Sequence, residues 1–502
     1  MRSALAARAA LLVAVCPLAL AGAGCSLAPR YQRPAPPVAA SAGAAGGAAS
    51  ASGVAELGWH DVFADPRLQA LIALALENNR DLRATALNVE LTRAQYRIQR
   101  AEQLPAIDAS GSVTRQRIPA VASATHLPVT ATTYTVGLGL AAFELDFFGR
   151  VRNLSSAALE QYLATEEAQR SASLSLVAQV ATEYLVERAL DDQVALAQRT
   201  LETVEASYAL SKRTYEAGRT NELDLRTAES QVLTARFNLS TAREQRAQAE
   251  NALVLLVGQP LPPTLPPPTP LDAQGFLADL PAGVPSEVLL RRPDILAAEH
   301  ALQSANALVG AARAAFFPSI TLTAFAGTSS AELSGLFGSG AAAAGTGWSG
   351  AGVWAFTPRI DVPIFRGGAL RAGLDVANAR KSIQVAQYER SIQVAFREVA
   401  DALVARAAIE EQLQAQTALV QAEQRRYDLS DLRYRKGIDS YLNVLTAQRD
   451  LFSAQQVLIQ SRLARLTNLV DLYRALGGGW RERSAEAAAP ASSAGAAPAQ
   501  GS

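Results

Sequence analysis

Few side chains in this sequence are suited to catalysis or to metal binding. The 502 residues include three histidines, two cysteines and one methionine, which is little material for a transition-metal site or a Cys/His nucleophile. The pair Glu299-His300 lacks a second histidine at the spacing of metal ligands. We therefore expect that the protein is not an enzyme and that it needs no metal or organic cofactor.

One glycine motif has the pattern of a phosphate-binding loop but the wrong surroundings. Residues 345–350 read Gly-Thr-Gly-Trp-Ser-Gly, whereas a dinucleotide-binding loop follows a parallel strand and opens a helix. Neither element is expected here, and the sequence contains no Walker motif. Any transport by this protein is therefore expected to be passive and energised elsewhere.

The composition argues against a nucleic-acid partner and favours long helices. Forty-six basic and 46 acidic residues give a formal net charge of zero, whereas a nucleic-acid binder carries an excess of Lys and Arg. Apolar residues make up 49% and aromatic residues only 6%. This Ala-rich composition favours extended helical elements over an aromatic core.

The amino terminus has the pattern of an export signal. Arg2 and Arg8 precede an apolar run at 9–21 that is too short to span a bilayer as a helix. We predict a signal peptide at residues 1–24 and an exported mature chain.

Cys25 is the candidate lipidation site. Ala23-Gly24-Cys25 matches the end of a lipobox, although Gly22 stands where an aliphatic residue is usual. We expect a diacylglycerol and an N-acyl group on Cys25, because a single acyl chain anchors only weakly. The alternative is cleavage after Ala21 or Ala23 by an ordinary signal peptidase, which leaves Cys25 as a free thiol.

The body of the chain is an internal duplication. Eight positions recur at a constant offset in the second half: Tyr208, Leu210, Ser211, Tyr215, Gly218, Leu223, Thr227 and Ala228 return as Tyr427, Leu429, Ser430, Tyr434, Gly437, Leu442, Thr446 and Ala447. The two halves are joined by a Pro-rich stretch whose prolines block a helix.

The predicted segments are a signal peptide at 1–24, a lipid-anchored extended segment at 25–64, a first repeat at 65–259, a Pro-rich joint at 260–285, a second repeat at 286–480 and a disordered tail at 481–502. Within the extended segment, residues 31–56 are predicted to be weakly ordered.

Each half is predicted to contain a helix, two strands and a long helical hairpin. The first helices, at about 65–103 and 286–316, end at prolines. Period-two alternation then predicts strands around 133–140, 320–325 and 354–360.

These alternating segments lie in regions with almost no charge. No charged residue occurs at 118–143, and Glu332 is the only one between Arg313 and Arg359. Because charge at mid-bilayer costs about 2–4 kcal/mol, we favour transmembrane strands over uncharged loops here. The tips at 119–132 and 329–347 are predicted to be loops.

The helices that follow carry a seven-residue apolar repeat. Residues 150–217 contain no proline and no glycine, and a helix of that length extends about 100 Å at 1.5 Å per residue. A sustained seven-residue repeat favours coiled-coil packing over a globular bundle. Gly218 and Gly437 are predicted to end one helix of each hairpin in a left-handed conformation.

Four strands cannot close a barrel alone, and an open sheet edge is not tolerated in hydrocarbon. Three copies would supply twelve strands and close the wall under cyclic symmetry. The predicted fold is therefore an α+β membrane protein, in which a trimeric 12-stranded transmembrane β-barrel with four strands per chain continues into a long periplasmic α-helical barrel of coiled-coil hairpins.

Several motifs resemble those of a known family. Residues 25–34, 71–82 and 291–295, together with Phe316-Phe317-Pro318 and both glycine turns, are similar to the outer membrane efflux lipoproteins of the TolC/OprM/NodT type. The resemblance covers almost the whole mature chain. It implies a homotrimeric, lipid-anchored channel-tunnel in the bacterial outer membrane that extends into the periplasm. The channel would carry drugs or other small molecules from a resistance-nodulation-division pump of the inner membrane, through a periplasmic adaptor, to the exterior.

The resemblance also implies residue roles at the helical tips. Adaptor contacts would fall on Gly218, Arg219, Gly437 and Ile438. The periplasmic gate would comprise Asp224, Tyr434, Asp439, Leu442, Asn443 and Thr446. Asp224 and Tyr434 match residues that pair across the closed entrance in the family, whereas Asp439, Asn443 and Thr446 depart from its pattern, so Leu442 is an alternative apolar constriction. For each of these residues, a solvated helix end or a coiled-coil contact is the plain alternative.

Two other functions remain open on the sequence alone. A periplasmic adaptor would contain one hairpin within a lipoyl-like module and no uncharged strands, whereas this chain has two hairpins that each follow a strand pair. A lipid-anchored coiled-coil scaffold would need no strands at all.

Overall fold

A computed structural model describes residues 26–39, 41–43, 58–123, 126–275, 283–285, 289–337, 351–478 and 482. The predicted signal peptide, Cys25 and most of the predicted tail lie outside these residues. The chain divides into two compact units, each built from three separate stretches of sequence. In the described residues, no helix is both long and apolar enough to cross a membrane.

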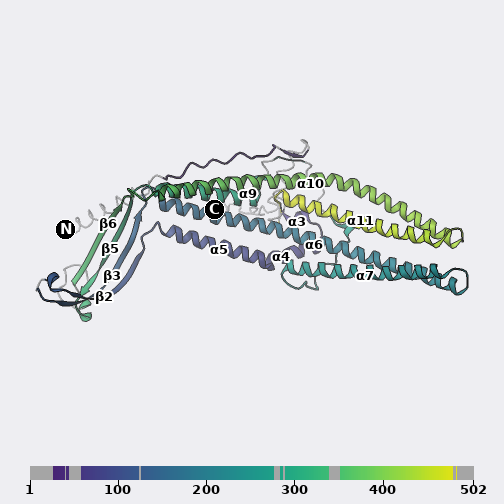
Figure 1. Ribbon diagram of the computed structural model, residues 1–502, viewed down its shortest axis with the longest axis horizontal. Coiled ribbons are helices and arrows are strands. Elements are labelled where there is room, and N and C mark those ends of the chain that lie inside the picture. The colour runs from purple at the N-terminus through teal and green to yellow at the C-terminus, as the bar shows by residue number, and fades with distance from the viewer. Residues whose placement is uncertain are drawn as a thin grey trace, which may run out of the picture. The chain divides into compact units, whose positions relative to one another are not determined.

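The first unit contains a four-stranded antiparallel sheet in the order β2-β3-β5-β6 (Figure 1). Its strands are β2 (Ile107–Ile118), β3 (Val129–Leu145), β5 (Ser319–Ser330) and β6 (Ala351–Asp361). Strands β2 and β6 form the two edges. Both edge strands are exposed along almost their whole length. Pro358 in β6 is consistent with an edge position, because proline cannot donate to a central ladder.

Glycines in the two central strands allow them to approach closely around one aromatic ring. A Cβ atom added to Gly137 would lie 2.6 Å from the Phe325 ring and 2.5 Å from the Ala326 carbonyl oxygen. A Cβ atom on Gly327 would lie 2.3 Å from the Val136 carbonyl oxygen. Glycine is therefore required at both positions by close approach.

An extended amino-terminal segment packs on helices of the same unit. The Ser26 hydroxyl donates to Asn153 Oδ1 at 2.9 Å. Arg33 donates to both oxygens of Glu299 at 2.8 and 2.6 Å, and the Tyr31 hydroxyl donates to Glu299 Oε1 at 3.0 Å. Because Glu299 is buried, its charge needs these partners. Tyr31 and Arg33 are thus fixed by Glu299, against the prediction of weak order at the start of this segment, and their own sequence gives no sign of a partner so distant in the chain.

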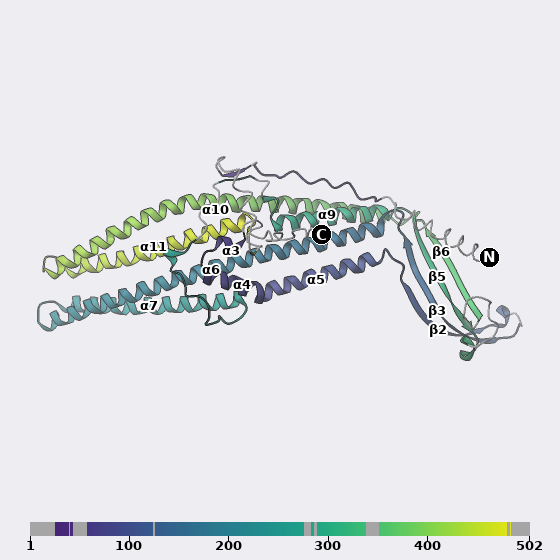
Figure 2. The ribbon, with the colours of Figure 1, turned by 180° about the vertical axis from the view of Figure 1, so that it is seen from behind.

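The second unit contains two helical hairpins, apart from the first residues of their long helices, which belong to the first unit. Helix α6 (Arg150–Glu216) is followed by α7 (Glu222–Val257), and α10 (Ala369–Arg435) by α11 (Tyr441–Ala475). In both views, α7 runs beside the end of α6 and α11 beside the end of α10 (Figures 1 and 2). The unit also contains α3 (Trp59–Val62), α4 (Pro66–Asn78), the first residues of α5 (Arg80–Ala101) and of α9 (Pro293–Ala314), the 3₁₀ turn η3 (Leu271–Ala273), and a short antiparallel pair, β1 (Ser41–Gly43) with β4 (Gly283–Pro285).

The seven-residue repeat of the helices is confirmed by burial in α7 and α11. In α7 the buried residues include Ala228, Ala235, Ala242 and Ala249 in one series, and Val232, Leu239 and Leu253 in another. In α11, Leu445, Ile459, Leu466 and Tyr473 of the seven-residue series are buried, and Phe452 of the same series is half-buried. Small alanines in one series permit close helix packing, as expected of a coiled-coil seam.

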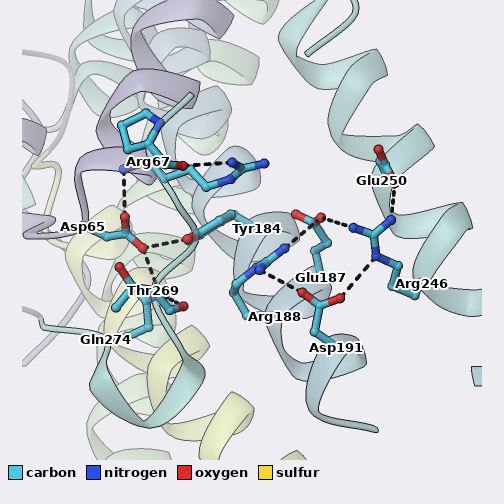
Figure 3. Close-up of polar contacts among 11 residues, drawn as sticks. Asp65, Arg67, Tyr184, Glu187, Arg188, Asp191, Arg246, Glu250, Thr269 and Gln274 are labelled. Atoms are coloured by element: carbon cyan, nitrogen blue, oxygen red, sulfur yellow. Dashed lines mark hydrogen bonds and ion pairs between the residues drawn. The ribbon is translucent and has the colours of Figure 1, made fainter. Parts of the chain in front are cut away.

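A buried polar network joins α4, α6 and the Pro-rich segment (Figure 3). Asp65 caps α4, because its Oδ1 accepts from the Arg67 amide at 2.8 Å and the Leu68 amide at 3.4 Å. Its Oδ2 accepts from the Tyr184 hydroxyl at 2.6 Å and from Gln274 Nε2 at 2.9 Å. Burial opposes ionisation of Asp65, but these hydrogen bonds outweigh it and hold the pKa of the carboxyl below its ordinary value.

Charged residues further along α6 connect it to α7 (Figure 3). Arg188 pairs with Glu187 at 2.8 Å and with Asp191 at 2.7 Å. Arg246 on α7 contacts Asp191 at 3.2 Å and also pairs with Glu250. The network links the two helices of the hairpin at the level of the Asp65 site.

The elements differ from the prediction in four places. The helix predicted at 65–103 breaks at Asn79, which ends α4 and caps α5 by accepting from the Leu82 amide at 2.8 Å. The strand pair β1–β4 was not predicted, since three-residue strands carry no periodicity. Strand β2 contains Asp108, Arg115 and Arg117, so it precedes the uncharged stretch instead of lying within it. Strand β3 begins at Val129, inside the predicted loop 119–132.

Candidate functional site

The two helical hairpins turn in the same way. Gly218 has φ +67° and Gly437 has φ +71°, as predicted. The Gly218 amide donates to the Tyr215 carbonyl at 2.8 Å and the Arg219 amide to the Thr214 carbonyl at 2.9 Å, and the equivalent bonds form at Gly437 and Ile438. This is the Schellman arrangement, in which a left-handed residue satisfies the last carbonyls of a helix.

Backbone conformation, not packing, requires glycine at both tips. No atom lies within 4 Å of a Cβ atom added to Gly218 or Gly437.

We expect Gly218→Ala and Gly437→Ala each to destabilise their turn by about 1–2 kcal/mol, the cost of a left-handed conformation with a side chain. Hydrogen exchange of amides in the turns measures this local stability. Gly373→Ala in α10 is the matched control, with open space and no positive φ, and should be neutral or stabilising. Equal exchange in all three variants would contradict this account of the tips.

A carboxylate lies at the start of the first return helix. Asn221 caps α7 by accepting from the Asp224 amide at 2.8 Å. Asp224 Oδ2 accepts from the Thr220 hydroxyl at 2.7 Å. An acid in the first turn interacts favourably with the helix dipole, and the hydrogen bond from Thr220 fixes the position of the Asp224 side chain.

The second tip is arranged differently. Asp439 receives two hydrogen bonds from Arg433, at 2.5 and 3.3 Å, and the bond to Arg433 lowers the pKa of Asp439. Leu442 is 66% exposed and Ile438 is 60% exposed. Thr446 donates its hydroxyl to the Leu442 carbonyl at 2.9 Å, and Asn443 is exposed.

Tyrosines from three helices gather behind the tips. The rings of Tyr434 and Tyr441 lie 5.1 Å apart, and Tyr208 and Tyr427 pack on the same buried cluster. Burial raises the pKa of Tyr441 to about 12. Burial, with a smaller contribution from the Asp224 charge, also raises the pKa of Tyr434. A groove of about 390 Å³ opens beside them; its lining includes Leu210, Tyr427, Asp431, Tyr434, Arg435 and Tyr441.

The structure therefore brings Asp224 and Tyr434 close enough to interact electrostatically. Within one chain, however, the Asp224 carboxylate is hydrogen-bonded to Thr220. Asp439 belongs to the turn through Arg433. The predicted site omitted Tyr441 and Arg433, although a tyrosine beside the seven-residue repeat and an arginine six residues before Asp439 were visible signals.

The sheet has one apolar and one polar face. Paired residues of an antiparallel sheet share a face, and the register places Ala109, Leu138, Ala326 and Trp354 in one row across all four strands. A neighbouring row on the same face contains Ile107, Leu140, Ala324 and Phe356. The opposite face carries Ser110, Ser112, Thr114 and Gln116 of β2. Trp354 is 80% exposed and Phe356 is 58% exposed, which is unfavourable in water but suits lipid.

The model of the outer membrane efflux protein family matches residues 71–259 and 284–478. The chain belongs to this family. The two matched stretches include both hairpins and all four strands of the sheet, and the resemblance inferred from the sequence motifs is confirmed.

Several efflux proteins are close relatives. The probable efflux pump outer membrane protein TtgC of Pseudomonas putida is 50% identical over 468 residues, which cover 92% of this chain and 94% of the relative. The outer membrane protein OprJ of Pseudomonas aeruginosa is 44% identical, over 93% of this chain and 95% of the relative. This chain is accordingly an outer membrane component of an efflux pump, and the comparisons do not favour the periplasmic adaptor.

Two solved structures of bacterial membrane proteins have the same fold. A membrane protein from Pseudomonas aeruginosa superposes with a TM-score of 0.84 at 45% identity, over 91% of this chain and 98% of that one. The open state of the Neisseria gonorrhoeae MtrE outer membrane channel gives 0.81 at 42% identity, over 92% of this chain and 100% of that one. These matches extend over both units of the efflux protein.

Proposed function

We propose that three copies of this efflux protein close a twelve-stranded barrel in the outer membrane and continue it as a helical tunnel in the periplasm. One observation carries the proposal: the four-stranded sheet has an apolar face and two unpaired edges, β2 and β6. An unpaired edge is not tolerated in hydrocarbon, so β2 of one copy must pair with β6 of the next. The two internal repeats then give six hairpins around one axis.

Exposed apolar stripes on the helices support the same assembly. Leu87, Leu91 and Ile98 lie along one side of α5, and each is more than half exposed. Val376 and Ile383 on α10 are also more than half exposed and are separated by seven residues. Stripes of this kind in a coiled coil require partner helices, and neighbouring copies supply them.

The amino-terminal segment supports a lipid anchor at Cys25. Ser26 is bonded to Asn153 at the start of α6, and Arg33 to Glu299. The residue next to Cys25 is thus fixed in the same unit as the sheet, near the end of β3, where acyl chains would reach the membrane. The acyl groups tether the terminus while the barrel itself spans the bilayer.

The tips are the proposed meeting point with a periplasmic adaptor, which connects the channel to an inner-membrane transporter of the resistance-nodulation-division type. Exposed Ile438 and the open space around both glycines offer room for an approaching helical hairpin. Substrates are drugs or other small molecules, conducted passively and without a cofactor.

The entrance is the proposed gate. Asp224 and Tyr434 lie within electrostatic reach, and Leu442 and its repeat equivalent Leu223 are both exposed at the helix starts. In a trimer, Asp224 forms a ring of three like charges. Leu442, with Asn443 and Thr446 beside it, supplies an apolar constriction, while Asp439 stiffens the second turn through Arg433.

Charge reversal at Asp224 tests the gate. Asp224→Arg removes the bond to Thr220 and places a cation at a helix start, which costs about 0.3–1 kcal/mol per copy. We expect a higher resting conductance and greater antibiotic permeability of cells. Asp224→Asn, which retains an acceptor for Thr220, isolates the contribution of charge, and Glu222→Gln in the same turn is the control. Unchanged leak in Asp224→Arg would remove this residue from the gate.

Planar bilayers test the channel itself. The purified full chain should produce discrete conductance steps, because a closed trimer encloses one water-filled path. Correctly folded trimer without such steps would contradict the proposal and would favour the scaffold.

A further inference from the structure

Two arginines interrupt the apolar face of the sheet at one end. Arg115 and Arg117 alternate with Thr114 and Gln116 in β2 and therefore share a face with Val113. Both are exposed, and their cross-strand partners are the uncharged Thr132 and Thr130. Arginine on a lipid-facing surface is unfavourable unless it lies near an interface.

The arginines lie beyond the apolar band and not within it. The apolar face begins at Ile360 in β6, and the row that contains Phe356 and Ile107 lies four residues further along. From Ile107, the face continues for six residues along β2 to Val113. Ten residues at about 3.4 Å, in strands tilted by about 40°, span about 26 Å. This matches the apolar band of outer membrane barrels, about 25 Å in height. Arg115 and Arg117 follow at about 5 and 10 Å further along the membrane normal.

The arginine end of the sheet is the outer one. Strand ends at Ile107, Leu145, Ser319 and Asp361 lead into helices, whereas β2 and β3 are joined by a short connection at the opposite end. Under the proposed function the helices are periplasmic, so this opposite end faces the exterior. Tyr134, paired with Val113, lies at the boundary where aromatic residues are enriched.

Neither arginine has an ion-pair partner within the described part of the chain. Residues 118–143 contain no acid. The neighbouring edge in a trimer would be the loop end of β6, and residues 338–352 carry no charge in the sequence. Glu332 is the single acid on this side of the sheet, in the connection after β5. The outer rim therefore carries a surplus of positive charge directed toward lipid.

We propose that Arg115 and Arg117 bind the phosphate groups of a phosphorylated glycolipid in the outer leaflet. Guanidinium groups form bidentate, charge-assisted hydrogen bonds with phosphate, and the acyl chains of such a lipid would cover Val113, Ala109 and Ile107 below. The two arginines are two residues apart on the same face of β2, so each copy provides one binding site and a trimer provides three. This inference rests on the proposed trimeric barrel.

Native mass spectrometry of the full-length trimer, titrated with bisphosphorylated or dephosphorylated lipid A, tests the proposal. The wild type should bind the phosphorylated form at least tenfold more tightly, and R115Q/R117Q should lose that preference. In the variant R115Q/R117Q/T114R/Q116R the net charge is restored on the opposite face, and the preference should stay lost.

The outcomes separate this inference from the proposed function. A wild type without preference for phosphate, or a preference retained in R115Q/R117Q, would overturn the lipid site while the trimer stands. Recovery of the preference in the face-switched variant would also overturn it, because binding would then depend on charge alone. A wild type that is monomeric would instead overturn the barrel.

Discussion

Leu138→Arg should prevent the protein from assembling in the membrane. Leu138 lies in central strand β3, in the same row as Ala326 and Trp354, so its side chain faces the middle of the apolar band. Arginine at mid-bilayer costs about 2–4 kcal/mol per copy, and a trimer would bury three. We expect loss of detergent-resistant trimer from the outer membrane fraction and loss of efflux-dependent resistance.

Thr135→Arg in the same strand is the matched control. Thr135 is paired with Ser112 and Ser329 on the polar face, which lines the water-filled path in the proposed barrel. This variant should assemble normally and change only conductance or ion selectivity. If both arginines were tolerated equally, or if Thr135→Arg alone prevented assembly, the assignment of the two faces would be wrong.

Asp65→Ala should cause the largest loss of stability in the helical unit. The substitution removes the cap of α4, worth about 1 kcal/mol, and leaves the buried Tyr184 hydroxyl without its acceptor, which costs about 1–3 kcal/mol. We expect a decrease of about 2–4 kcal/mol in the free energy of unfolding, measured by urea denaturation of the helical signal. Tyr184→Phe is the control and should cost only about 1 kcal/mol, because Gln274 and two amides still bind Asp65.

The effect of Asp65 should depend on pH in one direction. Its pKa is lowered in the folded protein, so its ionised form stabilises the fold above the unfolded value of about 3.9. That stabilisation is lost as the pH falls through the lower folded pKa. The difference between wild type and Asp65→Ala should therefore be constant near neutrality and shrink below about pH 4. A difference that grew on acidification would contradict the proposed state of the carboxylate.

Features that follow from a periodic pattern or from local backbone sterics were predictable from the sequence. The seven-residue repeat identified the buried faces of α7 and α11, and the glycines identified both turns, because a left-handed helix end selects glycine by backbone sterics alone. Alternation over six or more residues located β3, β5 and β6. The repeat and the alternation each act on many residues, and each turn glycine follows from the backbone conformation at its own position.

Features that depend on one distant partner were not predictable. Asn79 breaks a helix whose apolar pattern is continuous. Its side-chain oxygen caps α5 by accepting from the Leu82 amide, and its side-chain nitrogen donates to the Leu256 carbonyl at 2.8 Å. Glu299 orders the amino-terminal segment across more than 260 positions of the chain. Side-chain pairing of this kind leaves no periodic trace.

The most direct test of the central claim is the mass of the full-length protein extracted in a mild detergent. Native mass spectrometry should record a particle of three chains, because each sheet lacks the strands needed to seal its own edges. A stable particle of one chain that still contains the four-stranded sheet would contradict the account.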